Sequence, residues 1–301
     1  FRRRGEYDRA VRVHEHLMAR GDLSKADHQR AQHALALDYL KAGLLDRAED
    51  ALGKLEGTKF ETEARLARLA IFERTRDWAA AQQVAQQLQA SSKSSNLGSS
   101  GDFSIRLSHY LCEQAEGAAI EERSLLLQQA MAAAPQAARP AMMLAALQES
   151  GGEPDLALNT LLDGIKSAPI AIPLIANKLV QLGLQCQRIE PVQAALQAFY
   201  AQTHSLDALQ ALNHLQAASG ANDSSLLLAH LRDEPSLVIT AQLMKSSAET
   251  APDIQRALDK AAGPLLRYRC AACGFEASRH FWQCPGCQSW DSYSTRRVEE
   301  L

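Results

Sequence analysis

The stretch GLLDRA at residues 43–48 decides the fold, because its pattern of turn residue, large apolar residue and Ala returns along the chain. The pattern recurs as GEYDRA at residues 5–10, RDWAAA at residues 76–81 and, with Pro in the bulky position, GEPDLA at residues 152–157. Ala48 and Ala81 are 33 residues apart. A small residue at the closest point of two antiparallel helices lets them approach, so the pattern predicts stacked helical hairpins.

This pattern resembles the tetratricopeptide repeat, a helix-turn-helix unit of about 34 residues. The inner faces of two first helices would then carry Leu35 and Tyr39 in one unit, and Leu69 and Phe72 in the next. Helical spacing of apolar residues continues to about Ala262. We therefore expect an all-α fold, a tetratricopeptide-repeat superhelix (α-solenoid) over residues 1–262.

Composition supports a helical protein of about two domains. The chain has 301 residues, of which 46% are hydrophobic, and only 25 are Val, Ile or Thr, the residues that strands favour. A net charge of −3 gives no overall electrostatic attraction to a phosphate backbone, so nucleic acid is not expected as a partner. No apolar stretch approaches the 18 residues of a membrane-spanning helix.

Two further features concern the start of the chain and a break between two repeats. The chain begins at Phe1 without Met and enters a helical pattern at once, so we expect an N-terminally truncated repeat array with any membrane segment upstream. Residues 91–102 are rich in Ser, Gly and Asn and have little helical pattern, so we expect a flexible, irregular loop there.

Four of the six cysteines lie close together near the C-terminus. Cys270 and Cys273 form one Cys-x-x-Cys pair, and Cys284 and Cys287 form another, with room for a short hairpin between the pairs. Each Cys-x-x-Cys pair forms a tight turn, which we call a knuckle. Two knuckles can place four thiolates at the corners of a tetrahedron, which suits one iron or zinc ion. We therefore predict a small rubredoxin-like metal-binding domain over residues 265–301.

Three functional classes stay open from the residues alone. An iron site of this spacing, as in rubredoxins, favours electron transfer, whereas a zinc ribbon is compatible with nucleic-acid binding. Residues 265–301 hold five basic and four acidic residues, which is a weak footprint for a phosphate backbone. The chain has no Walker loop, no HExxH zinc motif and no Ser/His/Asp or Cys/His arrangement, so we expect a non-enzymatic protein-binding scaffold.

Four stretches together resemble the lipopolysaccharide assembly protein B (LapB, formerly YciM) family of Gram-negative bacteria. They are FRRRGEYDRAVRVH at residues 1–14, GLLDRAED at residues 43–50, YRCAACGF at residues 268–275 and WQCPGCQSW at residues 282–290. The resemblance implies that Cys270, Cys273, Cys284 and Cys287 are the metal ligands. It also implies a single N-terminal transmembrane anchor, absent from this sequence, that holds the protein at the cytoplasmic side of the inner membrane.

The resemblance further implies an adaptor that regulates lipopolysaccharide biosynthesis. Its expected partners are the membrane AAA+ protease FtsH, the lipid A pathway deacetylase that FtsH degrades, and lipopolysaccharide assembly factors. By repeat position, the side chains expected in a partner-binding groove are Arg30, His33, Glu63, Arg139 and Glu149.

Overall fold

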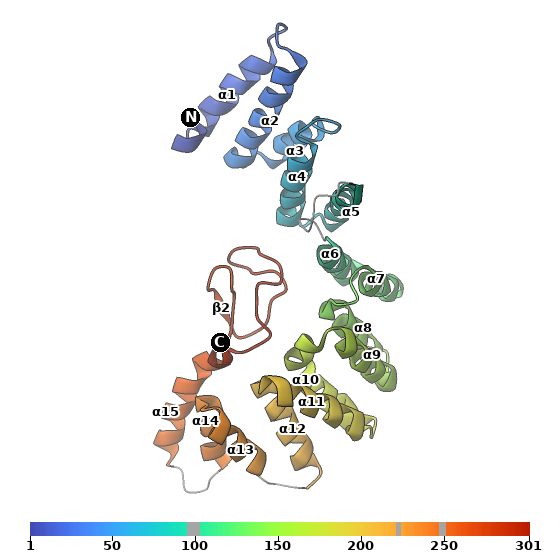
Figure 1. The fold of residues 1–301 in the computed structure, drawn as a ribbon, viewed down its shortest axis with the longest axis vertical. Coiled ribbons are helices and arrows are strands. Elements are labelled where there is room, and N and C mark those ends of the chain that lie inside the picture. The colour runs from blue at the N-terminus through green and yellow to red at the C-terminus, as the bar shows by residue number, and fades with distance from the viewer. Residues whose placement is uncertain (95–102, 221–223, 247–250) are drawn as a thin grey trace. The chain divides into compact units, whose positions relative to one another are not determined.

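The protein is helical apart from a small C-terminal module (Figure 1). The computed structural model describes residues 1–94, 103–220, 224–246 and 251–301, and fifteen α-helices lie within these ranges. By its internal contacts the chain divides into two compact units, Phe1–Ala119 and Ile120–Leu301. None of the helices in the described ranges combines the length and apolar character that crossing a bilayer requires.

The first unit is a run of helices in which each packs against the next in sequence. It consists of η1 (Arg2–Arg4), α1 (Tyr7–Met18), α2 (Lys25–Ala42), α3 (Leu45–Gly53), α4 (Glu61–Thr75), α5 (Trp78–Ser94) and α6 (Ser104–Gly117). The Ser24 hydroxyl caps α2 by accepting a hydrogen bond of 3.1 Å from the Asp27 amide, which satisfies one of the free donors of that helix end.

The second unit continues the helical hairpins and ends in the module. Its helices are α7 (Ile120–Ala133), α8 (Ala138–Ser150), α9 (Pro154–Ser167), η2 (Pro169–Ala171), α10 (Ile172–Gln185), α11 (Ile189–Thr203), α12 (Leu206–Ala218), α13 (Ser225–Asp233), α14 (Leu237–Ser246) and α15 (Pro252–Ala262). The module comprises η3 (Gly263–Leu266), β1 (Tyr268–Arg269), β2 (Glu276–Ala277) and η4 (Val298–Glu300).

The repeated Ala residues lie where the sequence pattern predicted. Ala48, Ala81 and Ala157 are fully buried, and Ala10 is 4% exposed. Each lies in the first turn of its helix. The predicted inner-face residues are also buried, namely Leu35, Tyr39, Leu69 and Phe72. The helical-hairpin fold is therefore confirmed.

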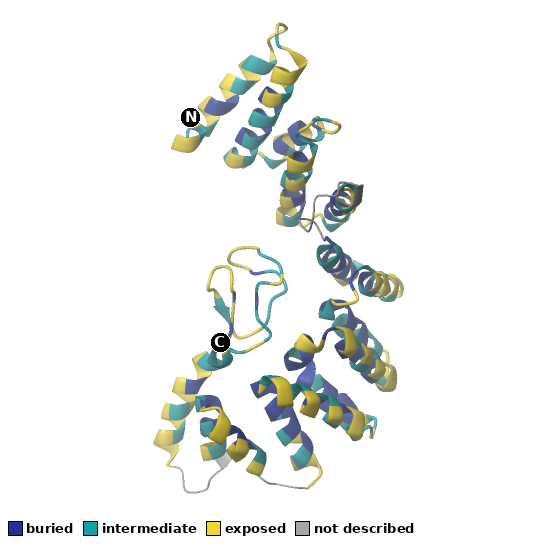
Figure 2. Ribbon diagram, in the orientation of Figure 1, coloured by how far each residue is buried: buried dark blue, intermediate teal, exposed yellow. Residues whose placement is uncertain are grey.

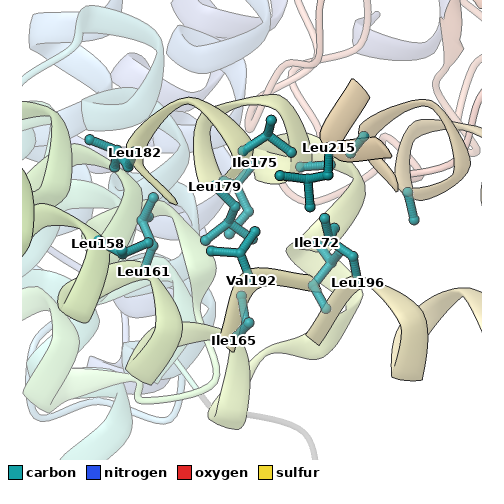
Figure 3. Close-up of a cluster of buried hydrophobic side chains, with 14 of the residues drawn as sticks. Leu158, Leu161, Ile165, Ile172, Ile175, Leu179, Leu182, Val192, Leu196 and Leu215 are labelled. Carbon is teal, nitrogen blue, oxygen red and sulfur yellow. The ribbon is translucent and has the colours of Figure 1, made fainter. Parts of the chain in front are cut away.

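Leu, Ile and Val side chains from α9, α10, α11 and α12 make the largest core of the second unit (Figure 3). Leu158 on α9, Leu179 on α10 and Leu196 on α11 are all fully buried. Full burial of one such side chain stabilises the fold by about 1.5–3 kcal/mol. Buried stripes alternate with exposed ones along the hairpins, as the burial colouring shows (Figure 2).

Helix α5 continues further than the composition suggested. The expected irregular loop was to begin at residue 91, but α5 extends to Ser94. The Ser91 hydroxyl donates a 2.9 Å hydrogen bond to the Gln87 carbonyl one turn earlier, so this polar group has a partner inside the helix. The expected start of the loop was therefore wrong, and residues 95–102 lie outside the described ranges.

Candidate metal centre

The first cysteine pair lies in the loop between β1 and β2. These strands pair antiparallel, with Tyr268 opposite Ala277. The Cys270 amide donates to the Phe275 carbonyl at 2.9 Å, and the Gly274 amide donates to the Cys270 carbonyl at 2.9 Å. Gly274 has a φ of 77°, a left-handed conformation that glycine adopts without steric cost.

The second cysteine pair repeats this arrangement. The Cys284 amide donates to the Ser289 carbonyl at 2.9 Å, and the Gln288 amide donates to the Cys284 carbonyl at 2.8 Å. Gln288 takes the position that Gly274 has in the first knuckle, with a φ of 61°. A bridge between Gln283 and Trp290 flanks this knuckle. Extended segments therefore enclose each knuckle, because the knuckle is itself a tight turn.

The four cysteine sulfurs converge on one point. All four Sγ atoms lie within 4.8 Å of one another. The Sγ atoms of Cys270 and Cys287 are 3.8 Å apart, and those of Cys273 and Cys284 are 3.7 Å apart. Four sulfurs placed tetrahedrally at about 2.3 Å from a zinc ion would be about 3.8 Å apart. The residues therefore fit a single four-coordinate ion, and they form a metal site.

The thiols differ in acidity. Burial opposes ionisation of Cys270, but hydrogen bonds from the Ser292 hydroxyl and from backbone amides outweigh it and lower its pKa to about 6. Hydrogen bonds from the side chain and amide of Ser289 lower the pKa of Cys287. The Phe275 amide favours the Cys273 thiolate, yet desolvation and the neighbouring cysteines raise its pKa to about 12. An incoming ion would have to displace a proton from Cys273, so metal affinity depends on pH.

A tetrahedral set of four sulfurs accepts either iron or zinc, so the donor atoms do not specify the ion. A bound zinc ion would serve as a closed structural crosslink, and a bound iron ion could also exchange an electron. Among the described ranges, these four cysteines are the single group of metal-binding side chains close enough to share an ion.

Aromatic residues supply the core of the module. Tyr268 and Tyr293 are each 5% exposed, and Leu174 of α10 packs against the same cluster. Burial is the main reason why the pKa of each tyrosine rises to about 12. His280 packs edge-on against Tyr268 with ring centroids 5.6 Å apart, so it serves the core and does not belong to the ligand set. Leu174 therefore attaches the module to α10 within the second unit.

The C-terminal tail, residues 296–301, forms a second attachment. Arg297 donates two hydrogen bonds to the Asp207 carboxylate of α12, from Nη2 to Oδ1 at 2.7 Å and from Nε to Oδ2 at 2.8 Å. A third donor, Nη1, reaches the Leu266 carbonyl at 2.8 Å. The guanidinium lies 4.1 Å from the ring centre of Tyr268, in the module core. Arg297 therefore joins the module core to α12.

Two tail glutamates cap helices that are distant in sequence. Glu299 accepts hydrogen bonds from the Leu237 amide at 2.6 Å and the Val238 amide at 3.2 Å, at the N-terminus of α14. Glu300 accepts one from the Leu206 amide at 3.0 Å, at the N-terminus of α12. Carboxylates satisfy the free donors of helix N-termini and interact favourably with the helix dipole. These contacts were not predicted, because an isolated pair of glutamates has no sequence pattern that distinguishes a cap from solvated surface.

The predicted partner-binding residues fall in both units. In the first unit His33 on α2 contacts Glu63 on α4, with Nε2 to Oε2 at 3.3 Å, and its ring stacks on Phe60 at 4.5 Å. Arg30 is exposed and pairs with Asp27 of its own helix. In the second unit, Glu149 pairs with Lys178 at 3.0 Å. Arg139 is only 5% exposed, which leaves little of its side chain for a partner.

Comparisons with known proteins agree with this architecture. Residues 268–293 match the family model described as rubredoxin metal binding domain. The chain is 27% identical over 312 residues to lipopolysaccharide assembly protein B of Escherichia coli strain K12, covering 97% of this chain and 77% of the relative. The protein of that name from Haemophilus influenzae is also 27% identical, over 322 residues, with 97% of this chain and 76% of the relative covered.

A solved structure titled for Pseudomonas aeruginosa pilF matches with a TM-score of 0.37 and 18% identity, and covers 73% of this chain and 97% of its own. The relatives of the preceding paragraph confirm the resemblance that the sequence indicated: the chain is homologous, over nearly its whole length, to lipopolysaccharide assembly protein B.

Proposed function

We propose that this chain is a non-enzymatic adaptor that regulates lipopolysaccharide biosynthesis from the cytoplasmic side of the inner membrane. In this proposal it brings the lipid A pathway deacetylase to the membrane protease FtsH and promotes its degradation. The observation that carries the proposal is the similarity to lipopolysaccharide assembly protein B over 97% of the chain, with the four-cysteine motif included. The relatives are named for assembly and not for catalysis, which supports a scaffold.

In this proposal residues 1–262 form the protein-binding repeats and residues 265–301 the metal-binding domain. Stacked helical hairpins offer rows of side chains on rigid helices, which suits recognition of a partner segment. The contact surface is proposed to include Arg30, His33 and Glu63, because α2 and α4 bring His33 and Glu63 together beside an aromatic ring. Glu149 is proposed for a second contact, in which it would have to exchange Lys178 for the partner. Arg139 is left out of this contact, because only 5% of it is exposed.

The metal would have a structural role in this adaptor. A bound ion crosslinks the two knuckles, and thiolate coordination supplies much of the folding free energy of so small a module. The folded module then presents Arg297, Glu299 and Glu300 to α12 and α14. Its expected contribution is to keep the last hairpins ordered while the repeats bind other proteins.

The test is the half-life of the deacetylase in host cells depleted of this protein. Restoring the full-length protein should shorten the half-life, and a His33→Ala/Glu63→Ala variant should fail to shorten it. Arg74→Ala is the matched control, since Arg74 is exposed on α4 at its other end. Crosslinking and pull-down from membranes should recover the protease and the deacetylase with the unaltered protein. A deacetylase half-life that is unchanged by depletion would exclude the proposed function.

A further inference from the structure

Helix α1 has an outward face of unusual composition. Arg9, Arg12, Val13 and His16 are spaced as successive turns of one helix face, and all four are exposed. The opposite face carries Ala10 and Val11, which are buried against the neighbouring helix. We call these four exposed residues the α1 face. It combines basic side chains with an apolar one, and the acidic residues nearest to it are Glu6, which pairs with Arg9, and the exposed Asp8 and Glu15.

The segment before α1 adds to this face. Arg2 donates to the Ala34 carbonyl at 3.3 Å and pairs with the buried Asp38 at 3.2 Å, which fixes η1 to α2. Arg3 and Arg4 are exposed. The Arg9 guanidinium lies 4.8 Å from the ring centre of Phe1, so the start of η1 lies beside the α1 face. We call the α1 face together with Arg3 and Arg4 the basic patch.

Much of the positive charge of the patch is not neutralised by the protein. Arg9 pairs with Glu6 at 2.6 Å. By contrast, Arg3, Arg4 and Arg12 make no ion pair or side-chain hydrogen bond within the described part of the chain. Exposed arginines without a partner present their charge to whatever approaches this surface.

The charge of the whole chain is divided unevenly. Residues 1–20 contain six arginines and three acidic residues, a net charge of +3, whereas the whole chain has a net charge of −3. The remaining residues therefore have a net charge of −6. An anionic surface attracts residues 1–20 and repels the rest, so such a surface would both bind and orient the protein.

We propose that the basic patch binds the anionic headgroups of a phospholipid bilayer. Membrane-surface helices typically combine Arg with exposed apolar side chains, which enter the boundary between headgroups and acyl chains. Phe1 is 54% exposed and Val13 is 50% exposed, and both lie among the arginines. The proposal rests on the membrane location in the proposed function, and it adds a direct lipid contact made by η1 and α1 themselves.

A nucleic acid is the other polyanion that such a patch could attract. Its phosphates would engage the arginines, but Phe1 and Val13 would gain nothing from a phosphate backbone. The negative charge of the rest of the chain would also oppose the approach of a long polyanion to any other surface. The combination of charge and apolar exposure therefore favours a bilayer.

The test is flotation of the chain with vesicles. We expect binding to phosphatidylcholine vesicles that contain 40% phosphatidylglycerol, no binding to pure phosphatidylcholine vesicles, and release at high salt. Reversing three unpaired charges, in an Arg3→Glu/Arg4→Glu/Arg12→Glu variant, should weaken partitioning on the order of a hundredfold or more. The matched control, Arg74→Glu/Lys245→Glu/Lys260→Glu, changes the net charge equally at exposed positions elsewhere and should keep binding.

Circular dichroism of both variants would confirm that they fold. Equal binding of the two variants, or binding that does not depend on phosphatidylglycerol, would overturn the proposal. Capture of duplex DNA by the patch without binding to vesicles would overturn it in favour of a nucleic acid. These outcomes are separate from the adaptor role, because deacetylase turnover in cells is measured independently of vesicle binding.

Discussion

Replacing Arg297 with Met should detach the C-terminal tail from α12. The substitution keeps an unbranched apolar side chain against Tyr268 but removes the two hydrogen bonds of 2.7 and 2.8 Å to the Asp207 carboxylate. The Asp207 side chain is 7% exposed and that of Arg297 is 18% exposed. The variant therefore leaves a buried carboxylate without its cation.

Removal of one partner of a buried ion pair costs about 3–5 kcal/mol. The partial exposure of Arg297 places the expected cost near the lower end, at about 3 kcal/mol. Because about 1.4 kcal/mol changes an equilibrium constant tenfold, the open form of the tail should become on the order of a hundredfold more populated. Glu299 and Glu300 leave with the tail, so the amides that they cap lose their acceptors.

Hydrogen exchange at those amides is the assay. The amides of Leu206, Leu237 and Val238 donate to the tail glutamates, and their protection should fall on the order of a hundredfold in Arg297→Met. Amides in the middle of α9, far from the tail in sequence, should keep their protection. The neighbouring exposed residue provides the control: Arg296 acts on Glu300 only through its charge, so Arg296→Met should change the protection of these amides far less than Arg297→Met does.

A second substitution separates the charge from the shape of the side chain. Asp207→Asn in the Arg297→Met background removes the uncompensated charge, so it should restore part of the lost protection. Unchanged protection in Arg297→Met, or an equal loss in Arg296→Met, would refute the reasoning. So would strictly additive effects of the two substitutions, because contacting partners must show a coupling energy.

Three further predictions concern the metal, the repeats and pH. Cys273→Ser should abolish stoichiometric metal binding, measured by elemental analysis of the purified protein, whereas Cys186→Ser should keep it. Stoichiometric metal in purified Cys273→Ser would contradict the four-sulfur site. Ala48→Leu should lower the free energy of unfolding by about 1–3 kcal/mol in thermal denaturation, because this fully buried position has no room for a larger side chain. Burial lowers the pKa of His230 below its usual 6.5, so the unfolded chain takes up a proton here at a higher pH than the folded chain does. The free energy of unfolding should therefore fall as the pH drops below 6.5. The variant His230→Gln should reduce this dependence of the free energy of unfolding on pH.

The sequence is most informative where a structural requirement repeats. Ala10, Ala48, Ala81 and Ala157 recur because every hairpin needs a small residue at the same close approach, and all four are buried. The cluster of four cysteines can be predicted from the sequence equally well, because tetrahedral coordination requires two tight knuckles and constrains the spacing of their cysteines. In both cases the physical requirement is local, so that it leaves a pattern within a few residues.

Contacts that occur once leave no such pattern. Arg297 and Asp207 are 90 residues apart, and neither belongs to a repeat position that marks it. The burial of Arg139 was missed for a related reason, since a charged residue at a helix start is typical of solvated surface. Helix α5 continues to Ser94 although Ser has no strong preference for helices, and within it the Ser91 hydroxyl donates a hydrogen bond to the Gln87 carbonyl.

The position of Arg297 has a consequence for the whole C-terminal half. Its guanidinium lies against Tyr268, two residues before the first metal ligand, and at the same time holds α12 through Asp207. Glu299 and Glu300 cap α14 and α12 from the same short segment, so the order of these helices depends on a folded module. Metal binding supplies much of the folding free energy of a four-cysteine module. The affinity for the ion and the order of α12 and α14 are therefore linked, and a substitution at Asp207 should weaken metal binding although its side chain contacts none of the four sulfurs.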